Sequence, residues 1–254
     1  MPGYAVKFSP FILTFHSLDT SGSPISFPPD SFLKLILTLK DKKIKVISLS
    51  DLVLWLNGEK ELHDPCIALT FDDGFENIYH HAFPILEEHQ MEATVFLTTN
   101  HIGRKNDWKN QPSNIPILPM LNWDQISEMS RSCFSFEAHT KNHPNLSQIP
   151  VEQAKEEIEQ SKRDIEEHLG KSVEFFCYPY GHYNPKVYEI IKQRFKGACS
   201  TEMNFLNRGI DIYLLPRIDM YYFSDEFLFS FFLSPLFRPY IQVRNFLRKI
   251  RYGF

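Results

Sequence analysis

The sequence predicts an α/β fold: a distorted (β/α) barrel of about seven parallel strands in a single domain. Short β-rich runs recur along the chain, they are apolar throughout rather than alternating, and amphipathic helical patterns separate them. Parallel strands that are buried on both faces have this character, and an open doubly wound sheet is the alternative architecture. The expected strands are residues 11–15, 45–49, 66–71, 93–97, 134–138, 173–178 and 197–201.

Helical periodicity fills the intervals between these runs. The clearest case is "VEQAKEEIEQSKRDIEEHLG", in which apolar residues recur every three to four positions from Val151 to Leu169. Gly170 then supplies a C-terminal stop. The expected helices are residues 30–41, 51–57, 76–89, 123–131, 151–169 and 185–194.

Composition narrows the class of protein. At 254 residues, with 43% hydrophobic side chains, the chain can bury a sizeable core. Its net charge of −4 gives no global basic field, so nucleic acid is not an expected partner. The four cysteines are far apart and fit no CxxC pattern, which indicates small core side chains rather than a disulfide or zinc framework.

The first 18 residues, "MPGYAVKFSPFILTFHSL", lack the basic region, the long apolar core and the cleavage site of a signal peptide. No run of 18 apolar residues is present that could span a bilayer. The expected location is therefore cytoplasmic.

Polar residues follow several of the expected strands, at the ends where parallel α/β folds place their functional groups. The first strand runs into His16, and the third, "IALTFDDG", runs into Asp72 and Asp73. The fifth strand leads into "HTKNHP", which contains His139 and His143. The adjacent acids have two interpretations: a turn in which Asp73 caps the next helix, or a site where a cation relieves their repulsion.

A metal site would use the two histidines. His139 and His143 are four residues apart, so one helical turn would bring both rings to the same side. Two imidazoles and one carboxylate leave open positions, as a catalytic zinc site requires. The second carboxylate could then accept a proton from the attacking water. The spacing alone does not distinguish the roles of Asp72 and Asp73.

The segments "TFDDG", "HTKNHP" and the "PYG" of "YPYG" resemble the first three motifs of the polysaccharide deacetylases, carbohydrate esterase family 4, over roughly residues 11–220. Members of that family have a distorted β/α barrel and remove acetyl groups from amino sugars with a divalent metal. The resemblance implies that Asp72 is the catalytic base and that one metal ion is held by Asp73, His139 and His143.

The metal expected from these ligand types is Zn²⁺, with Co²⁺, Mn²⁺, Ni²⁺ and Fe²⁺ as alternatives. The third motif implies that Pro179 and Tyr180 lie at the substrate, with the backbone N–H of Tyr180 facing the oxyanion. The apolar residues Leu206, Leu214 and Ile218 are candidates to line an acetyl pocket.

The sequence departs from the family pattern in two places. Cys177 stands where the third motif usually has an arginine, and the late Leu-x-His motif is absent. Arg217 in "LLPRIDM" is a candidate to orient the base, and an ordinary ion pair with Asp219 is the alternative. His16 in "TFHS" resembles the early catalytic histidine of the poly-N-acetylglucosamine deacetylases, which implies a general acid, and His182 is the competing candidate.

The function predicted is a metal-dependent hydrolase that removes an N-acetyl group from an amino sugar of a cell-surface glycan or its precursor. The partner is then an N-acetylated glycan. A deformylase or O-acetyl esterase with the same site, and a non-catalytic glycan-binding homologue, are the alternatives. The long loop 103–120, which contains Trp108, is either a cover for a sugar ring or a surface excursion.

The chain is expected to divide into a catalytic domain, residues 1–225, and an aromatic and basic segment, residues 226–254. The last 17 residues contain five basic side chains and no acid, and "FLFSFFLSPLF" precedes them. One interpretation is an element that lies on the inner face of a membrane. The other is a closing helix whose aromatic side chains pack under the barrel while its arginines are solvated.

Overall fold

The computed structural model describes residues 9–109 and 111–252. The expectation about the N-terminus depends on residues 1–18, and the first eight of these lie outside the described residues. Residue 110 of the long loop and the last two residues of the C-terminal segment also lie outside them.

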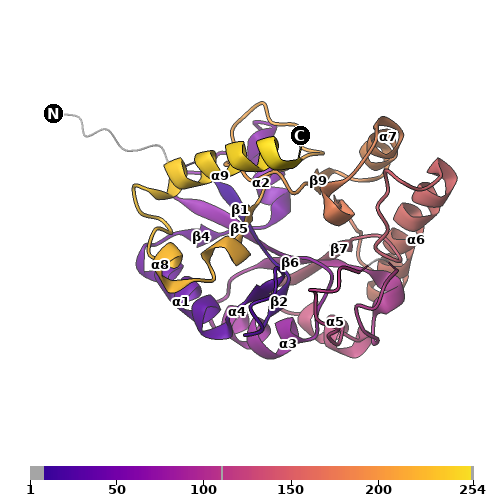
Figure 1. Cartoon of the computed structure of the whole chain (residues 1–254), viewed down its shortest axis with the longest axis horizontal. Helices are drawn as coiled ribbons and strands as arrows, with labels where there is room; N and C mark the ends of the chain where they lie inside the picture. The colour runs from indigo at the N-terminus through magenta and orange to yellow at the C-terminus, as the bar shows by residue number, and fades with distance from the viewer. Residues whose placement is uncertain (1–8, 110, 253–254) are drawn as a thin grey trace.

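Parallel strands form the centre of the fold in the order β10-β1-β5-β6-β7-β8-β9, and β4 pairs with the first part of β5 (Figure 1). A backbone bridge between Cys199 and Leu215 joins β9 to the segment that leads into β10, so the sheet curls toward closure. This confirms the predicted distorted barrel. The strands are β1 Phe11–Phe15, β4 Lys45–Val46, β5 Cys66–Phe71, β6 Ala93–Leu97, β7 Phe134–Ala138, β8 Phe175–Cys177, β9 Gly197–Cys199 and β10 Ile218–Asp219, with a separate pair of β2 Ser17–Leu18 and β3 Ser26–Phe27.

Helices surround the strands on the outside (Figure 1). Their starts follow from local capping: Ser48 accepts a hydrogen bond from the backbone of Asp51, and Asn184 accepts one from Val187. They are α1 Pro29–Asp41, α2 Leu49–Leu56, α3 Asn77–His81, α4 Phe83–Glu88, α5 Trp123–Met129, α6 Val151–Leu169, α7 Pro185–Arg194, α8 Glu226–Phe229 and α9 Phe237–Tyr252, with 3-10 turns η1 Thr99–His101, η2 Pro179–Gly181 and η3 Met220–Phe223.

Two expected elements differ from the structure by more than one or two residues at an end. The expected strand 45–49 is wrong beyond Val46, because Ser48 caps α2 and the helix starts at Leu49. The expected helix 76–89 is divided at Ala82 into α3 and α4. Pro84, near the start of α4, has no N–H and cannot continue an α-helix from the preceding turn.

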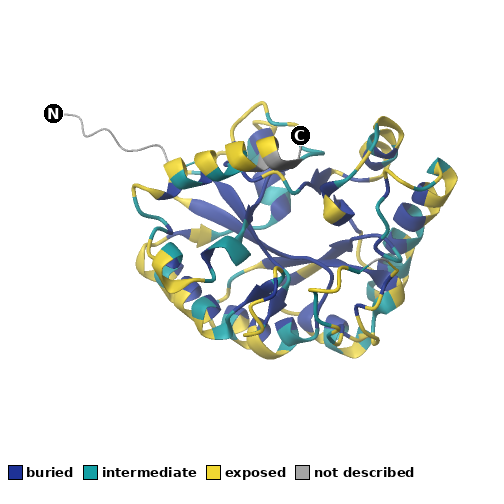
Figure 2. Cartoon of the chain, viewed as in Figure 1, coloured by how far each residue is buried: buried dark blue, intermediate teal, exposed yellow. Residues whose placement is uncertain are grey.

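Successive side chains of a strand point to opposite faces of the sheet, so the strands contribute to two hydrophobic cores. One face of each strand packs against the helices, and the other fills the barrel with residues such as Ile12, Ala68, Phe96 and Phe175. Figure 2 shows the result: the strands are buried and exposure is concentrated on the outer helices. The inward positions become polar toward the carboxyl ends of the strands, where Arg217 lies buried beside Asp72.

The C-terminal segment packs partly as its second interpretation predicts. Phe229, Phe232 and Phe237 are buried, and the Phe237 ring lies 5.6 Å from that of Phe11. Phe227 remains 70% exposed. Among the described residues no helix is both long and apolar enough to cross a bilayer. The division of the chain at residue 225 remains a prediction.

Glu137 on β7 is a buried carboxyl group inside the barrel. Its Oε2 accepts hydrogen bonds from the backbone N–H groups of Glu174 and Phe175, both at 2.7 Å. Burial raises its pKa to about 8, so the group keeps a proton near neutral pH. The side chain fixes the start of β8, which pairs directly with β7 only at Ala138 and Phe176.

We expect Glu137→Leu to lower the free energy of unfolding by about 2–4 kcal/mol, because two N–H groups lose their acceptor and each costs about 1–3 kcal/mol when unsatisfied. Glu137→Gln keeps an acceptor oxygen and should stay within about 1 kcal/mol of the wild type. Urea denaturation measures both. Equal stability of the two variants would show that the carboxyl group does not fix β8.

Candidate active site

The two adjacent acids lie in a tight turn at the end of β5. The Asp72 N–H donates to the carbonyl of Phe15, and Asp73 has a positive φ of 70°. Gly74 follows with φ of 91°, and a Cβ there would lie 2.7 Å from the Leu97 side chain. Asp73 does not cap a helix, because α3 begins at Asn77 without a side-chain cap. The capping interpretation therefore does not explain the pair.

Arg217 holds Asp72 through a buried bidentate ion pair. Its Nη1 and Nη2 donate to Oδ1 and Oδ2 of Asp72, both at 2.7 Å. Nη1 also donates to the hydroxyl groups of Thr14 and Thr70. Burial by itself raises the pKa of Asp72, but the charge and hydrogen bonds of Arg217 outweigh it and hold that pKa below its usual value. The structure thus pairs Arg217 with Asp72, while Asp219 accepts the N–H of Tyr221.

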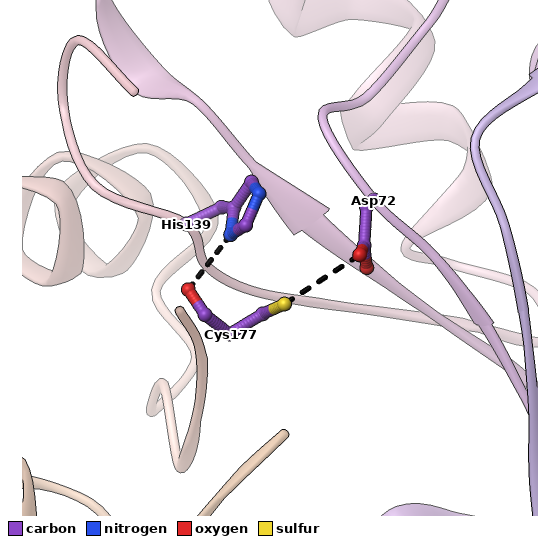
Figure 3. A group of neighbouring side chains, drawn as sticks. All are labelled: Asp72, His139 and Cys177. Atoms are coloured by element: carbon purple, nitrogen blue, oxygen red, sulfur yellow. Dashed lines mark hydrogen bonds between the residues drawn. The ribbon is translucent and has the colours of Figure 1, made fainter. Parts of the chain in front are cut away.

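Cys177 lies between the groups of this site (Figure 3). Its thiol donates to Oδ2 of Asp72 over 3.5 Å, and its sulfur lies 3.1 Å from Nη2 of Arg217. Its carbonyl group is 2.7 Å from Nδ1 of His139. Burial raises the pKa of the thiol to about 11, so it is neutral. The small thiol leaves room for the guanidinium group that arrives from another strand.

Asp73, His139 and His143 come together as a set of candidate metal ligands. Oδ1 of Asp73 lies 3.4 Å from Nε2 of His139 and 3.3 Å from Nε2 of His143. Ligand atoms about 2.0–2.1 Å from a tetrahedral zinc lie roughly 3.3–3.4 Å from one another, so these distances fit such an ion. Oδ1 of Asp73 is buried and accepts no hydrogen bond from the described residues. A cation held by the three residues would supply the partner that this oxygen lacks.

The electrostatics of the two rings differ. Burial lowers the pKa of His143 to about 3, which keeps the ring neutral, as a metal ligand must be. Burial also opposes a proton on His139, but the neighbouring carboxylates of Asp73 and Asp72 raise its pKa well above the usual value. The two carboxylates therefore favour positive charge at this point of the site.

No helical turn joins the two histidines, so that expectation is wrong. Residues 139–145 are irregular, with positive φ at Thr140 (67°) and His143 (56°). The Thr140 hydroxyl accepts the N–H of His143. Glu157 on α6 fixes the same loop, because its Oε2 accepts the N–H groups of Lys141 and Asn142. Tertiary hydrogen bonds, rather than a helix, converge the rings.

Asp72, His139 and Cys177 form a second group whose ligand atoms lie within 4.8 Å of one another (Figure 3). Both oxygens of Asp72 already accept from Arg217, and the thiol keeps its proton. This group therefore fits a cation less well than the set that contains Asp73.

His16 lies beside Asp72, with its Nε2 3.8 Å from Oδ2 of that carboxylate. It lines a cavity of about 190 Å³ together with Asp72, Asp73 and both candidate ligand histidines. His182 instead lines an adjoining groove of about 820 Å³. Of the two candidate general acids, His16 is the one that lines the same cavity as Asp72 and Asp73.

The third motif forms the turn η2, in which Tyr180 has a φ of 59°. The Tyr180 ring packs 4.6 Å from the ring of His143, and the residue lines both the cavity and the groove. Pro179 begins the turn and is buried. The motif therefore contacts the candidate metal set through the ring of His143.

Leu206, Leu214 and Ile218 are not among the described residues that line this cavity, and an acetyl pocket formed by them stays a prediction. The cavity is lined by other apolar groups, including Ile25, Pro112 and Ile115. Leu206 belongs to the barrel interior instead. Among the apolar residues of this cavity, the sequence pointed to Trp108, because it lies in the long loop 103–120. Trp108 is buried, lines both the cavity and the groove, and packs 4.4 Å from the ring of His143.

Residues 59–194, more than half of the chain, match the profile of the polysaccharide deacetylases. The chain belongs to this family. A Bacillus subtilis protein named for the same family, YxkH, is 27% identical over 208 residues, which cover 82% of this chain and 70% of that protein. A poly-β-1,6-N-acetyl-D-glucosamine N-deacetylase of Staphylococcus aureus is 28% identical over 203 residues, 76% of this chain and 67% of the relative.

Solved structures show the same fold in other deacetylases. The Streptococcus pyogenes deacetylase PplD, determined with acetate, matches with a TM-score of 0.72 at 24% identity. The matched region covers 83% of this chain and 92% of the PplD chain. IcaB from Ammonifex degensii also has a TM-score of 0.72 at 24% identity, over 83% of this chain and 91% of its own. At 24% identity, the comparison with these two structures shows a shared fold and nothing further.

We expect Glu157→Ala in this polysaccharide deacetylase to weaken metal binding about 10–100-fold, because the loop that positions His143 loses its acceptor. Titration calorimetry with Zn²⁺ measures the affinity, and circular dichroism checks the fold. Glu156→Ala is the matched control, since this neighbour on α6 has a side chain that is 60% exposed. Equal affinities of the two variants would contradict a positioning role for Glu157.

Proposed function

We propose that this polysaccharide deacetylase is a metal-dependent hydrolase that removes N-acetyl groups from the amino sugars of a glycan. The observation that supports it best is the difference in environment between the adjacent carboxylates of Asp72 and Asp73. Arg217 occupies both oxygens of Asp72, whereas Oδ1 of Asp73 faces two imidazole nitrogens without a hydrogen bond. One acid suits a fixed base and the other a metal ligand.

Asp73, His139 and His143 would hold the ion, and zinc suits a set of two imidazoles and one carboxylate. When bound, a divalent ion polarises the acetyl carbonyl group and makes water a stronger nucleophile. Asp72 accepts the proton of the attacking water, and Arg217 fixes the orientation of this carboxylate and keeps it ionised.

The departing nitrogen needs a proton, because a sugar amine is a poor leaving group as an anion. His16 is the proposed donor, because its Nε2 lies 3.8 Å from Oδ2 of Asp72 and it lines the same cavity. The C–N bond breaks as the proton moves from His16 to nitrogen, and the products are acetate and the free amine. The proton held on Asp72 then returns to His16 or to solvent. The backbone N–H of Tyr180 is the proposed donor to the oxyanion.

Two features of the site favour an acetyl group on nitrogen over the alternatives. The apolar side chains of Ile25 and Ile115 in the cavity match a methyl group, which a formyl group lacks. An acid beside the base is needed for an amine and less so for an alkoxide leaving group. A non-catalytic binder would need neither Asp72 held by Arg217 nor His16 beside it.

The groove beside the site supports an extended substrate. It shares Trp108, His143 and Tyr180 with the cavity, and continues past amide side chains that include Gln148 and Gln153. Amides and aromatic rings suit the hydroxyl groups and faces of sugar rings. The Staphylococcus aureus relative is named for a β-1,6-linked polymer of N-acetylglucosamine. We therefore propose a polymer or oligomer of N-acetylated hexosamine as the substrate.

Acetate release from β-1,6-linked N-acetylglucosamine oligomers of increasing length tests this function. We expect release that requires added Zn²⁺ or Co²⁺ and rises with length as the groove fills. Asp72→Asn should keep the metal but lose about 10²–10⁴-fold in kcat, because an amide cannot accept the proton. Metal content measured on the same preparations is the control. A near-normal kcat in Asp72→Asn would remove Asp72 from the base role.

We expect His16→Asn to remove the alkaline limb of the pH–rate profile of kcat, since the acid that loses its proton there is gone. His182→Asn is the matched control, because this ring lines the groove instead of the cavity. It should alter KM for long oligomers and leave the limb in place. Loss of the limb in His182→Asn and its persistence in His16→Asn would reverse the assignment.

A further inference from the structure

Helix α9 has two apolar faces, and the barrel uses only one. Phe237 is 4% exposed and Ile241 is fully buried, and both belong to the main hydrophobic core. Arg244 packs over the ring of Tyr222 at 4.0 Å along the same docked side. These contacts fix which side of the helix faces the fold.

The second apolar face points away from the fold. Val243, Leu247 and Ile250 are 60%, 56% and 67% exposed, and their spacing of four and three residues places them in one stripe. Phe246, 62% exposed, widens the stripe. Figure 1 shows α9 along the outer edge of the molecule, and Figure 2 shows much of its outward side exposed. A concentration of large apolar side chains in one exposed stripe indicates a docking surface.

The charge around this stripe is one-sided. Residues 238–254 contain five basic side chains and no acid, a charge of +5, so the rest of the chain carries −4 − 5 = −9. A second copy docked through the same stripe would bring two segments of +5 together, which like-charge repulsion disfavours. An anionic surface would attract this segment and repel the rest, so it would also orient the molecule.

We propose that the exposed apolar stripe of α9 binds the surface of a bilayer that contains anionic lipid, with the helix axis in the plane of the membrane. The apolar side chains enter the interface between head groups and acyl chains, and the net charge of +5 on residues 238–254 attracts the helix to anionic head groups. The sixteen residues of α9 extend about 24 Å at 1.5 Å per residue, and their charges suit an interfacial position rather than a spanning one.

Docking by this face would leave the active site accessible. None of the residues of α9 lines the cavity or the groove among the described parts of the chain. The inference is independent of the proposed function, because it rests on α9 and involves none of the residues proposed for catalysis.

Co-sedimentation of the full chain with vesicles tests the proposal. We expect binding to vesicles of equal parts phosphatidylglycerol and phosphatidylcholine, weakened by salt, and at least about tenfold weaker binding to pure phosphatidylcholine. Val243→Gln/Leu247→Gln should lower the affinity for anionic vesicles at least about tenfold. Leu33→Gln/Leu37→Gln is the matched control, since these α1 residues are also four apart and 40% and 42% exposed. This control should bind like the wild type.

A second measurement reports the position of the helix itself. The chain has three tryptophans of its own, so the wild type supplies the background. The additional emission in Phe246→Trp should shift to shorter wavelength on anionic vesicles, and brominated lipid should quench it. Absent binding, equal loss in both double variants, or emission that vesicles do not change would overturn the proposal. A dimer that dissociates in Val243→Gln/Leu247→Gln, without vesicle binding by the wild type, would also overturn it and assign the stripe to a second copy.

Discussion

The buried ion pair between Arg217 and Asp72 is the interaction on which the site depends. Asp72 and Asp73 are neighbours, both about 95% buried, and two uncompensated carboxylates could not remain ionised there. Arg217 compensates one of them, so the other can be reserved for a cation. Removal of one partner from a buried pair costs about 3–5 kcal/mol, so the arrangement tolerates little change.

Arg217 itself lies where the two ends of the sheet meet. Arg217 lies between Leu215, which bridges to β9, and Ile218, which pairs with β1. Its guanidinium group reaches across β1 to the end of β5 and contacts Thr14 on the way. Closure of the sheet therefore brings the arginine to the base. This topology explains how Cys177 can occupy the usual arginine position: the charge reaches the same carboxylate from another strand.

The sequence predicted best what depends on local pattern. The runs 66–71 and 93–97 and the helix 151–169 have the predicted bounds, because continuous apolar runs and helical periodicity are local signals. It also named the residues that converge at the site. It did not predict how His143 gets there, since that depends on Glu157, fourteen residues further along the chain. Nor could it find the apolar wall around Ile25, which only tertiary packing assembles.

Positive φ angles at non-glycine residues occur in this chain both after helices and in the loops of the site. Lys43 and Gln90 adopt them directly after α1 and α4, where a left-handed residue commonly ends a helix. Asp73, His143 and Tyr180 adopt them in the loops that follow β5, β7 and β8, where no α-helix end requires it. Such a backbone costs about 1–3 kcal/mol per residue and persists only where surrounding contacts determine it. For His143, its own N–H donates to the Thr140 hydroxyl and its loop donates two N–H groups to Glu157 on α6, so these hydrogen bonds hold the loop where the His143 ring meets Asp73.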